Sequence, residues 1–84
     1  MNVKALTDHQ LLIAIAEVNA ELGEDAPARD AEARSEALNA EGERRWGANE
    51  MDALAELVTG SRMDGDDFVA WARQAGQAWL DGTR

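Results

Sequence analysis

The sequence predicts an all-α domain, a small four-helix bundle with helices near residues 8–22, 27–46, 50–58 and 65–81. Three observations predict it. Apolar residues recur three and four positions apart, which places them on one side of a helix. Glycines stand between these periodic segments, where helices commonly end. β-branched and aromatic residues never alternate with polar ones over a useful length, so no strand pattern competes with the helices.

The first helix, over residues 8–22, has the clearest boundaries. Thr7 and Gln10 have the T-x-x-Q spacing of a capping box, and two leucines stand at the positions of a hydrophobic staple. Gly23 follows the last periodic residue and is a natural C-terminal stop. The apolar periodicity between these signals therefore predicts a helix that begins at Asp8.

The second helix, over residues 27–46, is rich in alanine, glutamate and arginine. We expect Asp25 to cap it, Pro27 to lie in its first turn and Gly47 to end it. Two acid-first pairs at i,i+4 spacing support the helix: Asp30 with Arg34, and Glu41 with Arg45. Its apolar side is made of small residues and one leucine, with a tryptophan at the end: Ala31, Ser35, Leu38, Gly42 and Trp46. Such a stripe permits close approach of a neighbouring helix but buries little apolar area.

The last two helices are predicted over residues 50–58 and 65–81. Asn49 is expected to cap the third helix, whose core side is Met51, Leu54, Ala55 and Val58. Asp64 is expected to cap the fourth helix, and two further aspartates in its first turn favour its dipole. The apolar line of the fourth helix is Phe68, Ala72, Ala75 and Trp79, flanked by Val69, Trp71, Gly76 and Leu80. A face this wide is expected to contact more than one other helix.

The composition excludes several classes of function. The 84 residues include 17 Asp+Glu against 8 Lys+Arg, for a formal net charge of −9. Affinity for nucleic acid comes mostly from Lys and Arg, so direct binding to DNA, RNA or an anionic membrane surface is not expected. The absence of cysteine excludes disulfides and zinc–cysteine sites, and is typical of cytoplasmic proteins. The longest apolar run, residues 11–16, is too short to span a bilayer, and no signal-peptide pattern is present. We expect one cytoplasmic domain over residues 1–84.

No catalytic, cofactor or metal site is predicted. His9 is the only histidine, and without cysteines or other convergent ligands it cannot build a zinc site, so a surface position is expected. The run 64–67 suggests a calcium loop, but the register fails because Gly60, Arg62 and Trp71 would then occupy positions that need oxygen donors. A small enzyme or metal sensor is an alternative carried only by His9 and this aspartate turn. The chain is expected not to be an enzyme.

A row of acids on the second helix carries the first functional hypothesis. Glu32, Glu36 and Glu43 share a side, with Asn39 between them, and the i,i+4 pair of like charges costs helix stability. An ordinary solvated face is the plain interpretation. The functional one is a surface that imitates phosphate spacing and occupies a basic groove on a partner. The candidate partner-binding residues are Glu32, Glu36, Glu43, Asp64, Asp66 and Asp67, with Trp46 as an anchor.

Surplus apolar surface on the first helix carries the second hypothesis. Ile13, Ala16 and Ala20 lie opposite the core line, and Leu12 lies between the two sides. A helix that is apolar on two sides is usually buried on two sides. A second copy of the chain, a different protein or another helix of the same monomer would cover these residues. The alternative function is therefore a small structural or assembly protein that self-associates, with a homodimer as one form.

The chain resembles small phage-encoded inhibitors as a type, because it is short, acidic and helical and has no catalytic motif. Some of those inhibitors, including some anti-CRISPR proteins, mimic nucleic acid and block a basic channel. Abundant alanine and seven arginines against one lysine favour a GC-rich coding sequence of a bacterium or its phage. The resemblance is one of class and implies a non-catalytic inhibitor that occupies a basic surface of nucleic-acid machinery. No cofactor is expected.

Overall fold

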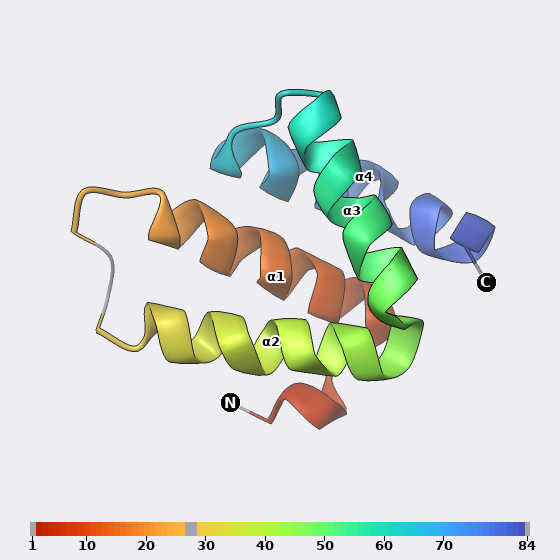
Figure 1. The fold of residues 1–84 in the computed structure, drawn as a ribbon, viewed down its shortest axis with the longest axis horizontal. Helices are drawn as coiled ribbons and strands as arrows, with labels where there is room; N and C mark the ends of the chain where they lie inside the picture. Colours follow the sequence, from red (N-terminus) through yellow and green to blue (C-terminus); the bar gives the residue numbers. More distant parts are fainter. Residues whose placement is uncertain (1, 27–28, 84) are drawn as a thin grey trace.

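The computed structural model describes residues 2–26 and 29–83 and contains four α-helices after a short 3-10 turn (Figure 1). The elements are η1 (Val3–Ala5), α1 (Asp8–Leu22), α2 (Ala31–Trp46), α3 (Ala48–Gly60) and α4 (Gly65–Thr83). The described part of the chain contains no strand, which confirms the all-α, four-helix prediction. Across these same residues, none of the helices combines the length and apolar character needed to cross a membrane.

The first helix, α1, is the central element of the domain. It makes its most extensive contacts with α4 and packs along another side against α2, while α3 leans mainly on α2. Figure 1 shows α1 and α2 side by side, with α3 crossing away from the end of α2. The buried core lies where these helices meet and is formed by Leu11, Leu12, Ile15, Ala16, Val18, Leu38, Leu54, Phe68, Ala72 and Leu80.

The predicted boundaries of α1 are confirmed at both ends. The hydroxyl of Thr7 accepts a hydrogen bond from the Gln10 amide at 3.1 Å, and the Gln10 side chain accepts from the Thr7 amide at 2.9 Å. Each residue thus satisfies a backbone N–H that the helix itself leaves free. Gly23 forms the C-cap.

The predicted start of α2 is wrong, because this helix begins at Ala31. Asp30 is its N-cap residue but makes no capping hydrogen bond, and its carboxylate instead pairs with Arg34 Nε at 3.0 Å. Asp25, the expected cap, lies in an exposed bend, and Pro27 lies outside the described residues. Ala31, the first residue of the observed helix, is fully buried.

Both predicted ends of α3 are also wrong, since the helix is longer in each direction. Gly47 has a φ of 91°, a left-handed value that glycine adopts at little cost, so this single residue separates the end of α2 from the start of α3. Asn49, the expected cap, is therefore already inside the helix. At the other end the helix runs through Gly60, and Arg62 takes the left-handed conformation with a φ of 52°.

The start of α4 is confirmed, but its core line is not the predicted one. The Asp64 side chain accepts a hydrogen bond from the Asp67 amide at 2.8 Å, and the helix continues past Gly82 to its last described residue. The buried line is Phe68, Ala72, Gly76 and Leu80, whereas Ala75 and Trp79 are only half-buried. A Cβ on Gly76 would lie 2.7 Å from Leu12 Cδ2, so the absence of a side chain at Gly76 allows this line of α4 to pack closely on α1.

A helix of the same chain covers much of the second apolar side of α1. Leu12 and Ala16 have no exposed area, and Gly65 of α4 lies against Ala20. Only Ile13 and Ala20 keep partial exposure among the four residues assigned to self-association. Leu12 and Ala16 therefore offer no side-chain surface to a second copy in this fold.

Candidate protein-binding surface

The charges of α2 are divided between two sides of the helix. All three arginines of α2 are engaged with acids: Arg34 Nη2 donates to Glu21 Oε1 at 2.8 Å, and both Arg44 and Arg45 donate to Glu41. The predicted pairs of Asp30 with Arg34 and of Glu41 with Arg45 are thereby confirmed. Nothing in the sequence indicates that Glu41 is buried, yet only 4 % of this residue is exposed.

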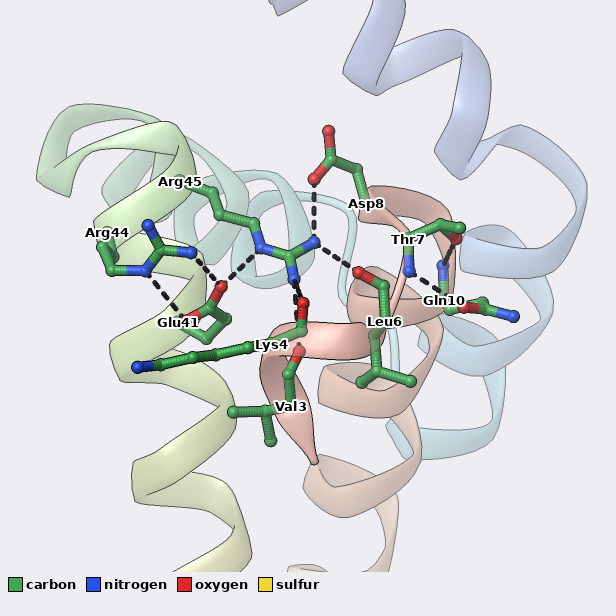
Figure 2. A network of polar contacts seen from close by, with 9 residues as sticks. All are labelled: Val3, Lys4, Leu6, Thr7, Asp8, Gln10, Glu41, Arg44 and Arg45. Carbon is green, nitrogen blue, oxygen red and sulfur yellow. Dashed lines mark hydrogen bonds and ion pairs between the residues drawn. The ribbon is translucent and has the colours of Figure 1, made fainter. Parts of the chain in front are cut away.

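Arg45 ties the N-terminal segment to α2 through backbone carbonyls (Figure 2). Its Nη1 donates to the carbonyl of Leu6 at 2.7 Å, and its Nη2 donates to those of Val3 and Lys4 at 3.2 Å each. A planar guanidinium presents several donors in a fixed fork and can serve these acceptors at once. The turn η1 is therefore held against α2 by one side chain.

Two carboxylates complete this network. Arg45 Nε donates to Glu41 Oε2 at 2.6 Å, and Arg45 Nη1 pairs with Asp8 Oδ1 at 3.1 Å. Arg44 Nε donates to the second oxygen of Glu41 at 3.0 Å. The hydrogen bonds from Arg44 and then from Arg45 lower the pKa of the Glu41 carboxyl from its usual 4.5 to about 2.

This lowered pKa predicts a specific loss of stability in acid. Because Glu41 binds its proton less readily in the folded chain, its contribution to the free energy of unfolding is fully present above about pH 4.5 and is lost as the pH falls towards 2. Urea unfolding of the wild type and of Glu41→Gln, followed between pH 7 and pH 2, measures this. We expect the gap between the two proteins to shrink across that window. A gap that stays constant down to pH 2 would contradict the assignment.

The opposite side of α2 carries the predicted acid row. Glu32, Glu36 and Glu43 are exposed, and within residues 2–26 and 29–83 none of them makes an ion pair or a side-chain hydrogen bond. Asn39, which lies between them, donates from Nδ2 to the carbonyl of Ser35 at 2.8 Å and to its hydroxyl at 3.1 Å. The structure therefore brings these three glutamates together on one helix face, where no arginine or lysine of the described residues pairs with them.

A groove of about 330 Å³ lies beside this row, and none of its lining residues is charged. It is lined by Ile15, Asn19, Ser35, Asn39, Met51, Leu54, Ala55, Val58, Thr59 and Phe68. The predicted core side of the third helix thus borders an open groove. The predicted core residues of this helix were Met51, Leu54, Ala55 and Val58. Only Leu54 is buried, and Ala55 is exposed, so the prediction that all four belong to the core is wrong.

Helical spacing places two further acids of α3, Asp52 and Glu56, next to residues that line the groove. Asp52 is three residues before Ala55, and Glu56 is three residues before Thr59, so each is a surface neighbour of a lining residue. Both acids are exposed and have no ion pair with any described residue. The sequence shows the i,i+3 spacing of these acids, but it does not show that a groove lies beside them.

None of the three candidate aspartates lines the groove. Asp64 uses its carboxylate as the cap of α4, and Asp67 is exposed in the first turn. Asp66 borders a separate hollow that Arg34, Glu17 and other residues line. The acids assigned to partner binding therefore fall into two groups, one beside the groove and one at the start of α4.

Trp46, the candidate anchor, packs at the junction of α2 and α3. It is half-buried against the core, and its Nε1 is enclosed without a hydrogen-bond partner among the described residues. A Cβ on Gly42 would lie 3.3 Å from the Trp46 ring and 2.8 Å from Met51 Sδ. The glycine thus makes room for both side chains, and the ring packs on its own domain.

His9, expected at the surface, is half-buried. Its Nε2 lies 2.8 Å from the carbonyl oxygen of Ala72, which makes Nε2 the donor. The contact joins the first turn of α1 to the middle of α4. The sequence offered no signal for it, because the acceptor is a backbone atom 63 residues away.

Over the described residues, no group of three or more histidine and acidic side chains has an arrangement that holds a metal ion. No protein-family model matches the chain, and neither curated proteins nor solved structures show a significant similarity to it.

Proposed function

We propose that this chain is a non-catalytic, acidic protein-binding module that docks on a basic surface of a protein partner. The observation that carries the proposal is the sorting of charge on α2. The arginines Arg34, Arg44 and Arg45 pair with acids on one side of the helix. The glutamates of the opposite side are exposed and form no ion pair with any residue that the structure describes. A negative electrostatic potential along a rigid helix speeds association with a positively charged surface and selects against acidic competitors.

A basic surface in nucleic-acid machinery is the partner class that fits this row best. A helix presents Glu32, Glu36 and Glu43 as a line of negative charges, which is what a phosphate-binding channel attracts. The net charge of −9 disfavours nucleic acid itself as the ligand. The proposed action is inhibition of the phage or bacterial type, in the cytoplasm, by occupying the surface that nucleic acid would use.

Self-association as a structural protein is the alternative, and it has less support. Leu12 and Ala16 are fully buried inside the chain, so only Ile13 and Ala20 would contribute area. Two copies that each carry −9 would also repel one another. The charge-sorted helix therefore supports binding to a basic partner better than binding to a second copy.

Neutralising the α2 row tests the proposed function. Glu32→Gln, Glu36→Gln and Glu43→Gln are combined, and the variant is used to capture proteins from a lysate of the native host at low salt. Because three unpaired charges are removed from the proposed contact, we expect retention of the wild-type partner to fall about ten-fold or more. Elution of that partner with salt, and its competition by a short DNA or RNA duplex, are read on the same beads.

The matched control removes the same charge elsewhere, with Glu24→Gln, Asp25→Asn and Asp81→Asn. All three residues are exposed and none lines the groove. The control is expected to retain the partner as the wild type does. Equal retention of the partner by both triple variants, with the same salt dependence, would show that the α2 row does not take part in binding.

A further inference from the structure

The α3 helix is the least covered helix of the domain. It packs mainly on α2, and of its apolar stripe only Leu54 is buried. Met51 and Val58 are half-buried and Ala55 is exposed. In a domain this small such a stripe is costly to leave in water, because burial of apolar surface is the main term that stabilises the fold.

The groove along this stripe is large enough to accept a side chain from another molecule. Its volume of about 330 Å³ lies at the lower end of the range of about 300–1,000 Å³ found for ligand sites. Ile15 and Leu54 are buried lining residues and give the groove an apolar floor. Four lining residues are polar: Ser35 and Asn39, which hydrogen-bond to each other, and Asn19 and Thr59, which are exposed.

Acids that form no ion pair with a described residue lie next to the lining residues on both helices. On α2, Asn39 has Glu36 three residues before it and Glu43 four residues after it. On α3, Asp52 and Glu56 stand next to lining residues in the same way. An uncharged groove between two negative edges is complementary to an apolar anchor flanked by Lys or Arg. It is not complementary to a second acidic copy or to nucleic acid, because like charges would meet at both edges.

We propose that this groove binds an apolar anchor side chain of a basic amphipathic helix from a protein partner. Helices recognised in grooves present apolar residues at i, i+3, i+4 and i+7, and their polar positions face the groove edges. The inference rests on the proposed function and locates it, since the basic partner meets the α2 row through the same edge. The α3 acids supply the second edge.

The probe is an 18-residue helical peptide with leucines at helical spacing and lysines at the other positions. Two matched peptides replace either every leucine with alanine or every lysine with glutamine. We expect the parent peptide to bind about ten-fold more tightly than either. Titration into isotope-labelled protein, followed by NMR, is expected to shift the amides of Asn19, Asn39, Ala55 and Thr59 first. This readout needs no variant of the protein.

Two variants of the protein separate the anchor from the charge. Ala55→Phe fills the groove from an exposed position, and Ala53→Phe is its control on the same helix outside the lining. The other variant combines Glu36→Gln, Glu43→Gln, Asp52→Asn and Glu56→Gln. Ala55→Phe and the charge variant are each expected to weaken the parent peptide about ten-fold, and Ala53→Phe is expected to leave it unchanged.

The other outcomes contradict the proposed binding at the groove, and they distinguish its failure from a failure of the proposed function. If Ala55→Phe binds as the wild type does and only the charge variant loses binding, the anchor is wrong and the acidic surface stands. If only Ala55→Phe loses binding, the role of the acid edges is wrong, and the proposed function fails with it. A wild-type dimer in sedimentation that Ala55→Phe dissociates would show that a second copy covers the groove, and would overturn the proposal.

Discussion

Replacing Arg45 with methionine is expected to lower the free energy of unfolding by about 3 kcal/mol, because a buried ion pair then loses one partner. Arg45 is 14 % exposed and serves the carbonyls of the N-terminal turn as well as Glu41. Methionine keeps much of the packing volume but supplies no donor. Urea unfolding followed by tryptophan fluorescence measures the loss, and hydrogen exchange at residues 3–6 reports whether the turn is released.

Two companion variants define what the loss means. Arg45→Lys keeps the charge, but an ammonium lacks the planar fork that reaches carbonyls and carboxylates together, so we expect it to recover only part of the stability. Arg73→Met removes an exposed arginine that lies 3.8 Å from Glu17, and should change stability by about 0.5 kcal/mol or less. Equal stability of Arg45→Met and Arg73→Met would show that the network does not hold the fold together.

The Arg45 network also explains why the acid row of α2 faces outwards. The buried residues of α2 include only one large apolar side chain, Leu38, so apolar burial alone fixes the rotation of this helix weakly. The hydrogen bonds of Arg45 to the N-terminal carbonyls and its ion pair with Asp8 of α1 connect the helix to the rest of the domain on the other side, and Glu41 of the same helix holds the guanidinium in place. This arrangement is consistent with the exposure of the glutamates on the opposite face.

The sequence predicted helix number and type well because these depend on local signals. The boundaries of α1 were correct since a capping box and a glycine stop act within a few residues of the helix ends. The later boundaries depended on conformations that composition does not reveal. Gly47 turns the chain in one residue with a positive φ, and Arg62, rather than the neighbouring Gly60, takes the left-handed conformation at the end of α3.

The candidate site was predictable only in part, for a similar reason. The acid row on α2 follows from i,i+3 and i,i+4 spacing, which the sequence displays directly. The groove does not, because the apolar stripe of α3 has the same sequence pattern whether or not another helix covers it. The stripe consists of Met51, Leu54, Ala55 and Val58. The burial of Glu41 was equally hidden, since Arg45, its visible partner, also bonds to carbonyls about 40 residues away.

Gly65→Ala is expected to destabilise the domain by about 2 kcal/mol, although alanine is the better helix former. A Cβ at Gly65 would lie 2.5 Å from Ala20 Cα and 2.8 Å from Ala20 Cβ. Backbone atoms of a packed helix cannot move aside as a flexible side chain can, so α1 and α4 must separate. Overpacking of this kind costs about 1–3 kcal/mol, and a glycine-to-alanine gain of at most about 1 kcal/mol does not offset it.

Gly60→Ala is the matched control, because no atom lies within 4 Å of the Cβ that it would add. We expect it to be neutral or to stabilise the domain by up to about 1 kcal/mol, since it reduces the freedom of the unfolded chain. Combining Gly65→Ala with Ala20→Gly removes one of the two close contacts, so the double variant should recover part of the loss and reveal a coupling between the sites. Additive effects of Gly65→Ala and Ala20→Gly would mean that the closeness of α1 and α4 does not depend on this glycine.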